Sequence, residues 1–232
     1  MPAKERRPSD DAPKLRDMPG PRRAEGFIGP LFQKVFTWPY RWALRALYRA
    51  GLRPWQLTLL SLATNVVIGW LLVRGDRFLP GVLLIVAGLL DIFDGGVARL
   101  RGEAGPAGAF LDSVLDRVSD VVLFGALYWS LAGQGHELAA ALALVSLVVS
   151  LLVSQIRAEA EAMGLRLTEG LMQRLERYVL LMIGLAAPGA LLPVLIVLSA
   201  LGTVTVLQRT DSVFRQLGRR RRRRVTRPSS AI

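Results

Sequence analysis

The chain has 232 residues, of which 52% are hydrophobic, and it carries a formal net charge of +12 with no cysteine. Its apolar residues stand in long uncharged runs, such as 55–73 and 138–156. A hydrocarbon layer about 30 Å thick requires about 20 such residues in a helix, so a soluble or disordered protein is excluded. The lack of cysteine excludes disulfides, thiolate catalysis and cysteine-bound zinc. We therefore expect an all-α, polytopic membrane protein.

The first part of the chain is polar. Residues 1–26 are rich in charge and proline and lack the apolar segment of a signal peptide, so we expect a disordered arm. Over 27–51, apolar and basic residues alternate at helical spacing, with Arg41, Arg45 and Arg49 on one ridge. This pattern predicts an amphipathic helix that lies in the membrane interface. A first membrane span shortened by these charges is the alternative.

Six apolar segments follow, and we expect each to span the membrane. They cover approximately 55–74, 79–100, 107–132, 137–160, 170–188 and 190–208. The last two lie in one uncharged stretch, 178–208, which is broken only by Pro188, Gly189 and Pro193, and these residues suit a tight hairpin. We expect 52–210 to form one six-span domain and 211–232, which contains an arginine run at 219–224, to form a basic tail.

The basic residues predict the orientation of these spans. An even number of spans leaves both ends of the chain on one side, and that side also holds most of the loop arginines: Arg99, Arg101, Arg157, Arg166, Arg174 and Arg177. The opposite loops hold only Arg74 and Arg77. By the positive-inside rule, we expect both termini on the cytoplasmic side of the cell membrane. There the basic ends would meet anionic lipids, and we expect no nucleic-acid partner.

Aspartates lie near the cytoplasmic ends of the second and third predicted spans, where a charge is costly and is usually functional. They are Asp91, Asp94, Asp112, Asp116 and Asp120. Helical spacing places the first two on one face, and the third and fourth on one face of the next helix. The short loop 100–107 predicts that these helices are antiparallel neighbours, so the two faces can meet. For Asp120, an ion pair with the adjacent Arg117 is the alternative to a functional role.

Four converging carboxylates require cations between them. Oxygen ligands favour Mg²⁺ or Mn²⁺, and a cluster of four suits two ions. Gly95, Ala98 and Gly108 leave room for a bulky ligand beside the carboxylates, although close helix packing would also explain small residues. Arg99 is a cation suited to phosphate. Together these features predict a site for a metal-bound diphosphate.

The spacing of these residues resembles the signature of the CDP-alcohol phosphotransferase family. The chain matches every fixed position, in the pattern Asp91-x2-Asp94-Gly95-x2-Ala98-Arg99-x8-Gly108-x3-Asp112-x3-Asp116. The resemblance extends over about 28–210 and includes, more loosely, a proline-containing turn at 52–58 that lies beside the cytidine in the family. An ordinary helix start after Pro54 is the alternative for this turn. It implies an enzyme that transfers a substituted phosphate from a CDP-linked donor, commonly CDP-diacylglycerol, to an alcohol and releases CMP.

The resemblance also implies roles for individual residues and a homodimer. The metal ligands would be Asp91, Asp94, Asp112 and Asp116, with Asp116 also acting as the base. The donor pocket would be lined by Gly95, Ala98, Arg99 and Gly108.

The second half of the chain resembles phosphatidylinositol phosphate synthases and their archaeal ether-lipid counterparts. The likeness lies in Ser154-x2-Arg157-x3-Glu161-x2-Gly164-Leu165 and in Gly170-Leu171-x2-Arg174-x2-Arg177. It implies that Arg157, Arg174 and Arg177 bind the phosphate of a phosphorylated polyol, with inositol phosphate ahead of glycerol 3-phosphate. Glu159 stands where many of these enzymes have arginine, which removes one phosphate ligand and leaves the acceptor open. Anchoring of helix ends at lipid headgroups is the alternative role for the arginines, and a cation transporter is the alternative function.

Overall fold

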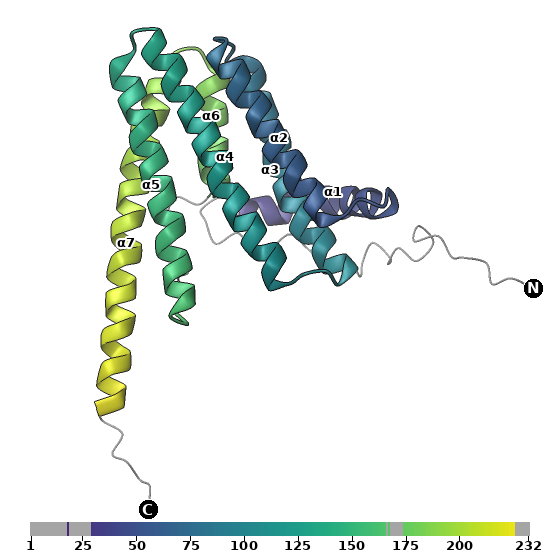
Figure 1. Cartoon of the computed structure of the whole chain (residues 1–232), viewed down its shortest axis with the longest axis vertical. Helices are drawn as coiled ribbons and strands as arrows, with labels where there is room; N and C mark the ends of the chain where they lie inside the picture. Colours follow the sequence, from purple (N-terminus) through teal and green to yellow (C-terminus); the bar gives the residue numbers. More distant parts are fainter. Residues whose placement is uncertain (1–17, 19–28, 166, 168–173, 226–232) are drawn as a thin grey trace, which may run out of the picture.

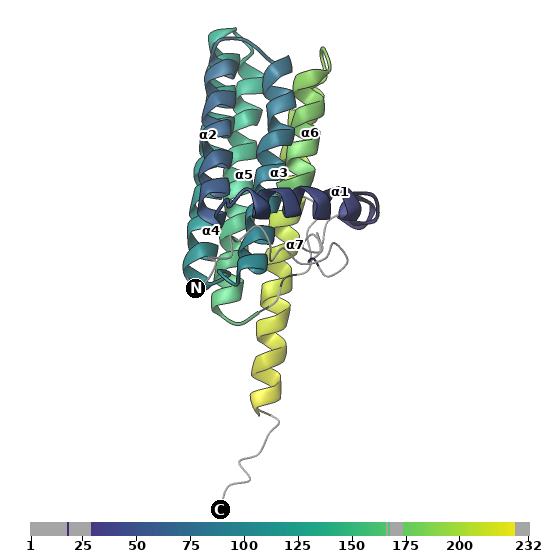
Figure 2. The ribbon, with the colours of Figure 1, turned by 90° about the vertical axis from the view of Figure 1, so that its right-hand side faces the viewer.

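The computed structural model describes residues 18, 29–165, 167 and 174–225, and all regular structure within them is helical. The helices are α1 (Gly29–Arg49), α2 (Pro54–Val73), α3 (Phe78–Arg101), α4 (Pro106–Gly133), α5 (Glu137–Ala162), α6 (Arg174–Ala186) and α7 (Leu191–Val225). Helices α2 to α7 run side by side as a bundle, and α1 lies across it (Figures 1 and 2). The expected all-α class is confirmed.

Proline and glycine set several of the helix ends. Pro54 and Pro106 stand at the first positions of α2 and α4, where the missing N–H costs nothing because that group has no partner within the helix. Gly102 ends α3 with φ of +68°, a left-handed conformation that glycine adopts without strain. The link between α3 and α4 is therefore short, as the sequence predicts.

Helix α2 separates the two aspartate-bearing helices. It packs against both α3 and α4, whereas α3 and α4 share few or no close contacts among the described residues. Ser61 of α2 donates a hydrogen bond to the Ala87 carbonyl of α3 (3.1 Å), and Gly69 of α2 admits Val122 of α4, which would lie only 3.1 Å from an added Cβ. The expectation that α3 and α4 are direct neighbours is thus wrong. Their backbones are not in close contact, but the side chains of their aspartate-bearing faces approach one another.

The main apolar core fills the half of the bundle away from the α3–α4 link. It joins α2 to α7 through buried side chains that include Ile68, Leu72, Leu84, Leu123, Leu127, Leu131, Leu181 and Leu195. At about 25 cal/mol per Å² of apolar surface, this burial holds the helices in register and so sets the positions of the polar residues at the other end.

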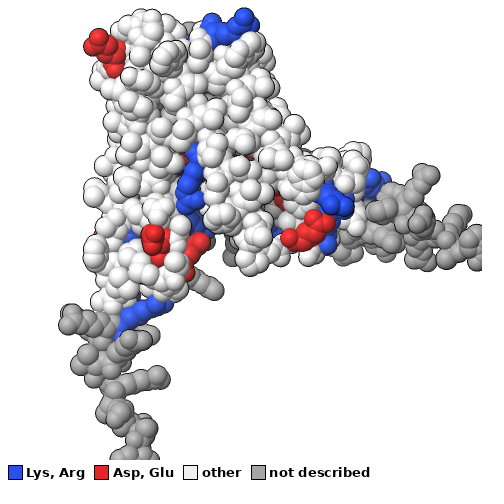
Figure 3. All heavy atoms as spheres, viewed as in Figure 1, with Lys and Arg blue, Asp and Glu red and all other residues white. Residues whose placement is uncertain are grey.

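Four of the described helices are long and apolar enough to cross a membrane: α2, α3, α5 and α7 over Leu191–Arg220. The upper half of the face in Figure 3 is almost free of charged atoms below its top edge. A multi-pass membrane protein is therefore confirmed. Helices α4 and α6 are not among these four. Helix α4 carries several charged residues, Asp112, Asp116, Arg117 and Asp120, and α6 has only 13 residues.

Helix α1 is amphipathic and contacts the bundle through α3. The Tyr40 ring stacks on Phe93, with ring centroids 5.3 Å apart. Tyr40 and Leu44 lie directly over Gly96, so closely that no Cβ would fit there. Trp42, on another face of α1, is 67% exposed. The described bounds of α1 agree with the predicted amphipathic helix, and its position in a membrane interface stays a prediction.

The structure describes only parts of the two predicted ends of the chain. The predicted arm, except Met18, lies outside the described residues, as do 226–232 and the predicted start of the fifth span at 170–173. At the other end, α7 continues to Val225, well beyond the span predicted to end near 208. An ion pair one helical turn apart, Asp211 to Arg215 at 2.8 Å, supports this extension. Arg220 also donates hydrogen bonds to the carbonyls of Met163 (2.9 Å) and Gly164 (2.6 Å), at the end of α5.

Candidate active site

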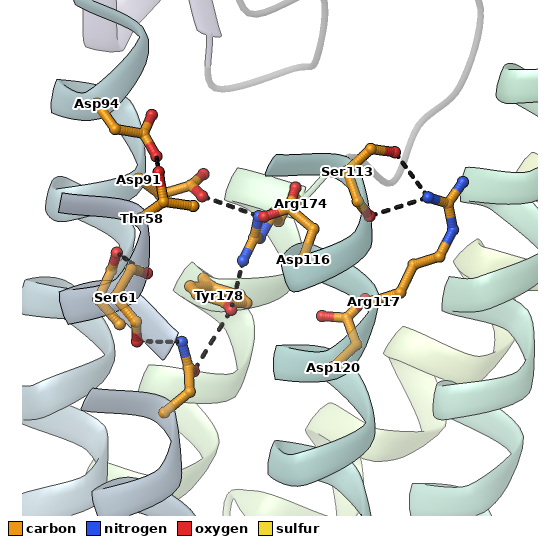
Figure 4. A network of polar contacts seen from close by, with 12 residues as sticks. Thr58, Ser61, Asp91, Asp94, Ser113, Asp116, Arg117, Asp120, Arg174 and Tyr178 are labelled. Atoms are coloured by element: carbon orange, nitrogen blue, oxygen red, sulfur yellow. Dashed lines mark hydrogen bonds and ion pairs between the residues drawn. The ribbon is translucent and has the colours of Figure 1, made fainter. Parts of the chain in front are cut away.

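An acidic cluster lies in the space between α3 and α4. Asp91 of α3 and Asp112 and Asp116 of α4 each present a carboxylate oxygen, and these oxygens lie within 4.8 Å of one another. Arg174, the first residue of α6, donates from Nη1 to Asp91 (3.0 Å) and forms an ion pair with Asp116 (Figure 4). Oxygen ligands at this spacing suit a hard divalent cation, and the bound guanidinium shows that the cluster attracts positive charge.

Asp94 lies apart from these three. It is buried, and its carboxylate accepts hydrogen bonds from the Thr58 hydroxyl (2.9 Å) and the Gly95 N–H (2.5 Å). Thr58 belongs to α2, so the contact holds Asp94 against that helix. The structure therefore brings three of the four predicted metal ligands together and directs the fourth toward α2.

A chain of buried polar groups connects Arg174 to α2. Arg174 Nη2 donates to the Tyr178 hydroxyl (3.2 Å), and that hydroxyl lies 3.5 Å from Asn65 Oδ1, to which it donates. Asn65 in turn donates from Nδ2 to the Ser61 carbonyl (2.9 Å). Sequence reasoning missed Tyr178 and Asn65. An asparagine within an apolar span was the available signal, since such a residue needs a partner inside the bundle.

A pocket of about 530 Å³ lies beside the cluster, where α2 and α4 begin and α3 ends. All four predicted donor-binding residues line it, together with Asp94, Asp112 and the start of α2: Pro54, Trp55, Thr58, Asp94, Gly95, Ala98, Arg99, Gly108 and Asp112. A Cβ on Gly108 would meet no described atom within 4 Å, and one on Gly95 would meet only Arg99 Nη1, at 3.5 Å. Helix packing therefore does not require these glycines. Their small size keeps the pocket open.

Tyr40 of α1 lies close to Arg99, which lines this pocket. Burial raises the pKa of its phenol above the usual value, while the positive charge of the nearby Arg99 guanidinium opposes that rise. The phenol is therefore neutral at physiological pH.

A second pocket, of about 390 Å³, lies on the other side of the cluster and is bounded by α4, α5, α6 and α7. Asp112 and Asp116 line it, and so do arginines from all four helices: Arg117, Arg157, Arg174, Arg177 and Arg209. Figure 3 shows basic atoms in a hollow between α4 and α5. All three predicted acceptor-binding arginines line this pocket. Asp112 lines both pockets, so the two meet at the acidic cluster.

Sequence reasoning missed Arg117 and Arg209 as pocket residues. Arg209 is 3% exposed and donates to the Val153 carbonyl (2.8 Å). Arg117 reaches back along α4 to the hydroxyl (2.6 Å) and carbonyl (2.9 Å) of Ser113 (Figure 4), because helical side chains point toward the preceding turn. The alternative pairing of Arg117 with Asp120 is therefore wrong.

Arg177, Arg157 and Glu159 differ in their surroundings. Arg177 is buried and pairs with Asp120 at 3.3 Å. Arg157 is exposed and pairs with Glu161 at 2.9 Å. Glu159 lies on the exposed side of α5, accepts a hydrogen bond from Gln155 (2.9 Å) and is absent from the lining of the second pocket. Its negative charge therefore does not face the arginines that we expect to bind phosphate.

Comparisons with known proteins agree with this geometry. Residues 52–208 match the model of the CDP-alcohol phosphatidyltransferase family. The chain is 34% identical to a phosphatidylinositol phosphate synthase of Mycobacteroides abscessus, over 72% of this chain and 80% of that protein. It is 36% identical to one of Corynebacterium glutamicum, over 67% and 75%.

Solved structures give the same result. The crystal structure of Mycobacterium tuberculosis phosphatidylinositol phosphate synthase with CDP-DAG bound has 32% identity and a TM-score of 0.68, covering 74% of this chain and 92% of that one. The same enzyme in complex with manganese and citrate has 31% identity and a TM-score of 0.67, covering 74% and 87%. The family model covers more than half of the sequence, including both aspartate-bearing helices. This chain therefore belongs to the CDP-alcohol phosphatidyltransferase family.

Proposed function

We propose that this enzyme transfers a phosphatidyl group from CDP-diacylglycerol to a phosphorylated polyol, with inositol phosphate as the preferred acceptor, and releases CMP. The observation that carries this proposal is an acidic cluster between two pockets, one built of small residues with Arg99 and one lined by five arginines. Similarity to phosphatidylinositol phosphate synthases, one solved with CDP-DAG bound, supports the choice of donor and acceptor.

The donor would occupy the first pocket. Arg99 would bind the diphosphate, and Gly95, Ala98 and Gly108 would allow it to approach the backbone. Two Mg²⁺ or Mn²⁺ ions, held by Asp91, Asp94, Asp112 and Asp116, would polarise the phosphoryl group and neutralise the leaving phosphate. The complex of a relative with manganese supports a divalent ion.

The acceptor would occupy the second pocket. Arg157, Arg174 and Arg177, together with Arg117 and Arg209, would bind a phosphomonoester, because a guanidinium can make two charge-assisted hydrogen bonds to phosphate oxygens. Asp116, at the edge of this pocket, would take the proton of the attacking hydroxyl. The hydroxyl oxygen would then bond to the phosphatidyl phosphorus. The bond between that phosphorus and the bridging oxygen would break, and its electron pair would leave with CMP.

We propose that α2 to α7 all cross the cell membrane and that the termini and the site face the cytoplasm, with α1 in the interface. The arginine-rich loops on that side support this orientation, and resemblance to the family supports a homodimer. Because the chain has no cysteine, single cysteines can test the orientation with an impermeant maleimide. His136→Cys should react in intact cells, and Ala104→Cys should react only after permeabilisation. The reverse pattern would contradict it.

The test of the function is release of CMP by the purified protein from CDP-diacylglycerol. Inositol phosphate, glycerol 3-phosphate, inositol and serine are compared as acceptors, with Mn²⁺, Mg²⁺ or EDTA. We expect metal-dependent release, fastest with inositol phosphate. A preference for glycerol 3-phosphate would support the pocket for phosphate but contradict inositol phosphate as the acceptor. A preference for inositol or serine would refute a pocket for phosphate.

A further inference from the structure

Asp120 is a buried carboxylate that neither the family signature nor the proposed reaction uses. It lies one helical turn after Asp116, is 3% exposed, and faces α5 and α6 from α4. A buried charge is costly unless it is paired, so its partners indicate what it does.

Both partners of Asp120 bind the same oxygen. Oδ2 accepts a hydrogen bond from Ser150 of α5 (2.5 Å) and one from Nη2 of Arg177 of α6 (3.3 Å). Ser150 is 1% exposed. One carboxylate thereby joins three of the four helices that bound the arginine-lined pocket.

Arg177 retains bonding capacity for a ligand. It lines the pocket along with Asp116, and its Nε is buried without a hydrogen-bond partner among the described residues. An arginine side chain has several rotatable bonds, so without an anchor its guanidinium would lose rotational freedom on binding phosphate. An anchor that removes this freedom in advance improves binding.

We propose that Asp120, supported by Ser150, is a positioning residue that holds the Arg177 guanidinium in place to bind the phosphate of the acceptor. This inference rests on the proposed function, because it assumes that the arginine-lined pocket takes the acceptor. Asp120 also lines this pocket, but its negative charge would repel a phosphate, so it acts on the acceptor through Arg177.

Steady-state kinetics of CMP release test this role, with KM measured separately for inositol phosphate and CDP-diacylglycerol. Asp120→Asn should raise the acceptor KM about tenfold and change kcat and the donor KM by less than about threefold, as expected for loss of acceptor binding alone. Ser150→Ala keeps the ion pair and should raise the acceptor KM about threefold.

Ser146→Ala is the matched control. Ser146 is on the same helix one turn earlier and is also buried, but it bonds across the bundle to Ser199 (3.1 Å), whereas Ser150 bonds to Asp120. It should leave all three constants unchanged. A shift in acceptor KM equal to that of Ser150→Ala would reveal a general packing effect and overturn the inference.

A double-mutant cycle separates positioning from an independent effect. Arg177→Gln should raise the acceptor KM, and adding Asp120→Asn should raise it no further, because Asp120 acts through Arg177. Two outcomes would overturn this inference and leave the proposed function standing. One is an additive effect of the two substitutions on the acceptor KM, and the other is an acceptor KM that rises in Arg177→Gln and not in Asp120→Asn. An unchanged acceptor KM in Arg177→Gln would instead refute the acceptor pocket itself. If Asp120→Asn does not fold, the Ser150→Ala and Ser146→Ala pair decides.

Discussion

Asp116 and Asp91 form a matched pair for testing the proposed base. Both are half-buried carboxylates that pair with the same nitrogen of Arg174, Nη1. Replacing either with asparagine removes one charge from the cluster and weakens one of the two ion pairs of Arg174. The two variants should therefore lose similar stability, and a difference in their catalysis reports on chemistry.

The expected magnitudes separate the two roles. An ion pair between partly exposed side chains, here 19% exposed for Arg174, 22% for Asp91 and 33% for Asp116, is worth up to about 1 kcal/mol, or about fivefold in an equilibrium constant. A positioned general base contributes about 10²–10⁴-fold, equivalent to about 3–5 kcal/mol of activation free energy. Loss of the base is thus far larger than loss of the ion pair.

Two measurements distinguish the variants: CMP release, and metal-dependent binding of CDP-diacylglycerol. We expect Asp116→Asn to lose turnover by at least about 10²-fold while still binding the donor when Mn²⁺ is present. Asp91→Asn should weaken donor binding as well as turnover, because its proposed role is to hold metal alone. Turnover by Asp116→Asn within about fivefold of the unmodified enzyme would refute the assignment of the base, since the ion pair alone would account for that loss.

Three further predictions concern the surroundings of the site. Gly96→Ala should destabilise the contact of α1 with α3 by about 1–3 kcal/mol, because its methyl group overlaps Tyr40. The control is Gly125→Ala, where an added Cβ would meet no described atom within 4 Å. Thermal unfolding in detergent is the measurement, and equal melting temperatures of the two variants would contradict the close contact. Deletion of 221–232 should leave activity in detergent within about threefold, because this basic segment lies beyond the family signature and is expected to bind anionic lipids. Loss of activity would assign the tail to the site. Tyr178→Phe removes the hydroxyl between Arg174 and Asn65 and should lower turnover about tenfold, as expected for loss of a hydrogen bond to a charged group; unchanged turnover would show that Arg174 needs no such support.

Local patterns predicted the helices and much of the site. Pro54, Gly102 and Pro106 mark helix ends through their own backbone preferences. Asp112 and Asp116 share a face because they stand one helical turn apart. The short link between α3 and α4 predicts that Asp91 can approach both, and the three carboxylates do lie close together. Their roles as metal ligands and base stay predictions.

Contacts between distant segments could not be predicted in this way. Thr58 holds Asp94 from 36 residues away, and Arg177 reaches Asp120 across 57 residues. Arg117 is the nearer cation to Asp120 in the sequence, yet its side chain turns toward Ser113. The choice between the two arginines depends on how α6 packs, which no local pattern contains.

The sequence by itself determined the class of protein, the ends of most helices and the family, because hydrophobic run length, glycine and proline preferences and motif spacing are local properties. The tertiary structure decided that α2 separates α3 from α4, that α7 continues to Val225 and contacts the end of α5 through Arg220, and that Arg209 joins the arginines of the second pocket. These features arise where side chains from several helices compete for the same buried space. The outcome depends on the packing of the whole bundle, since a buried charge must find its partner wherever that packing leaves one.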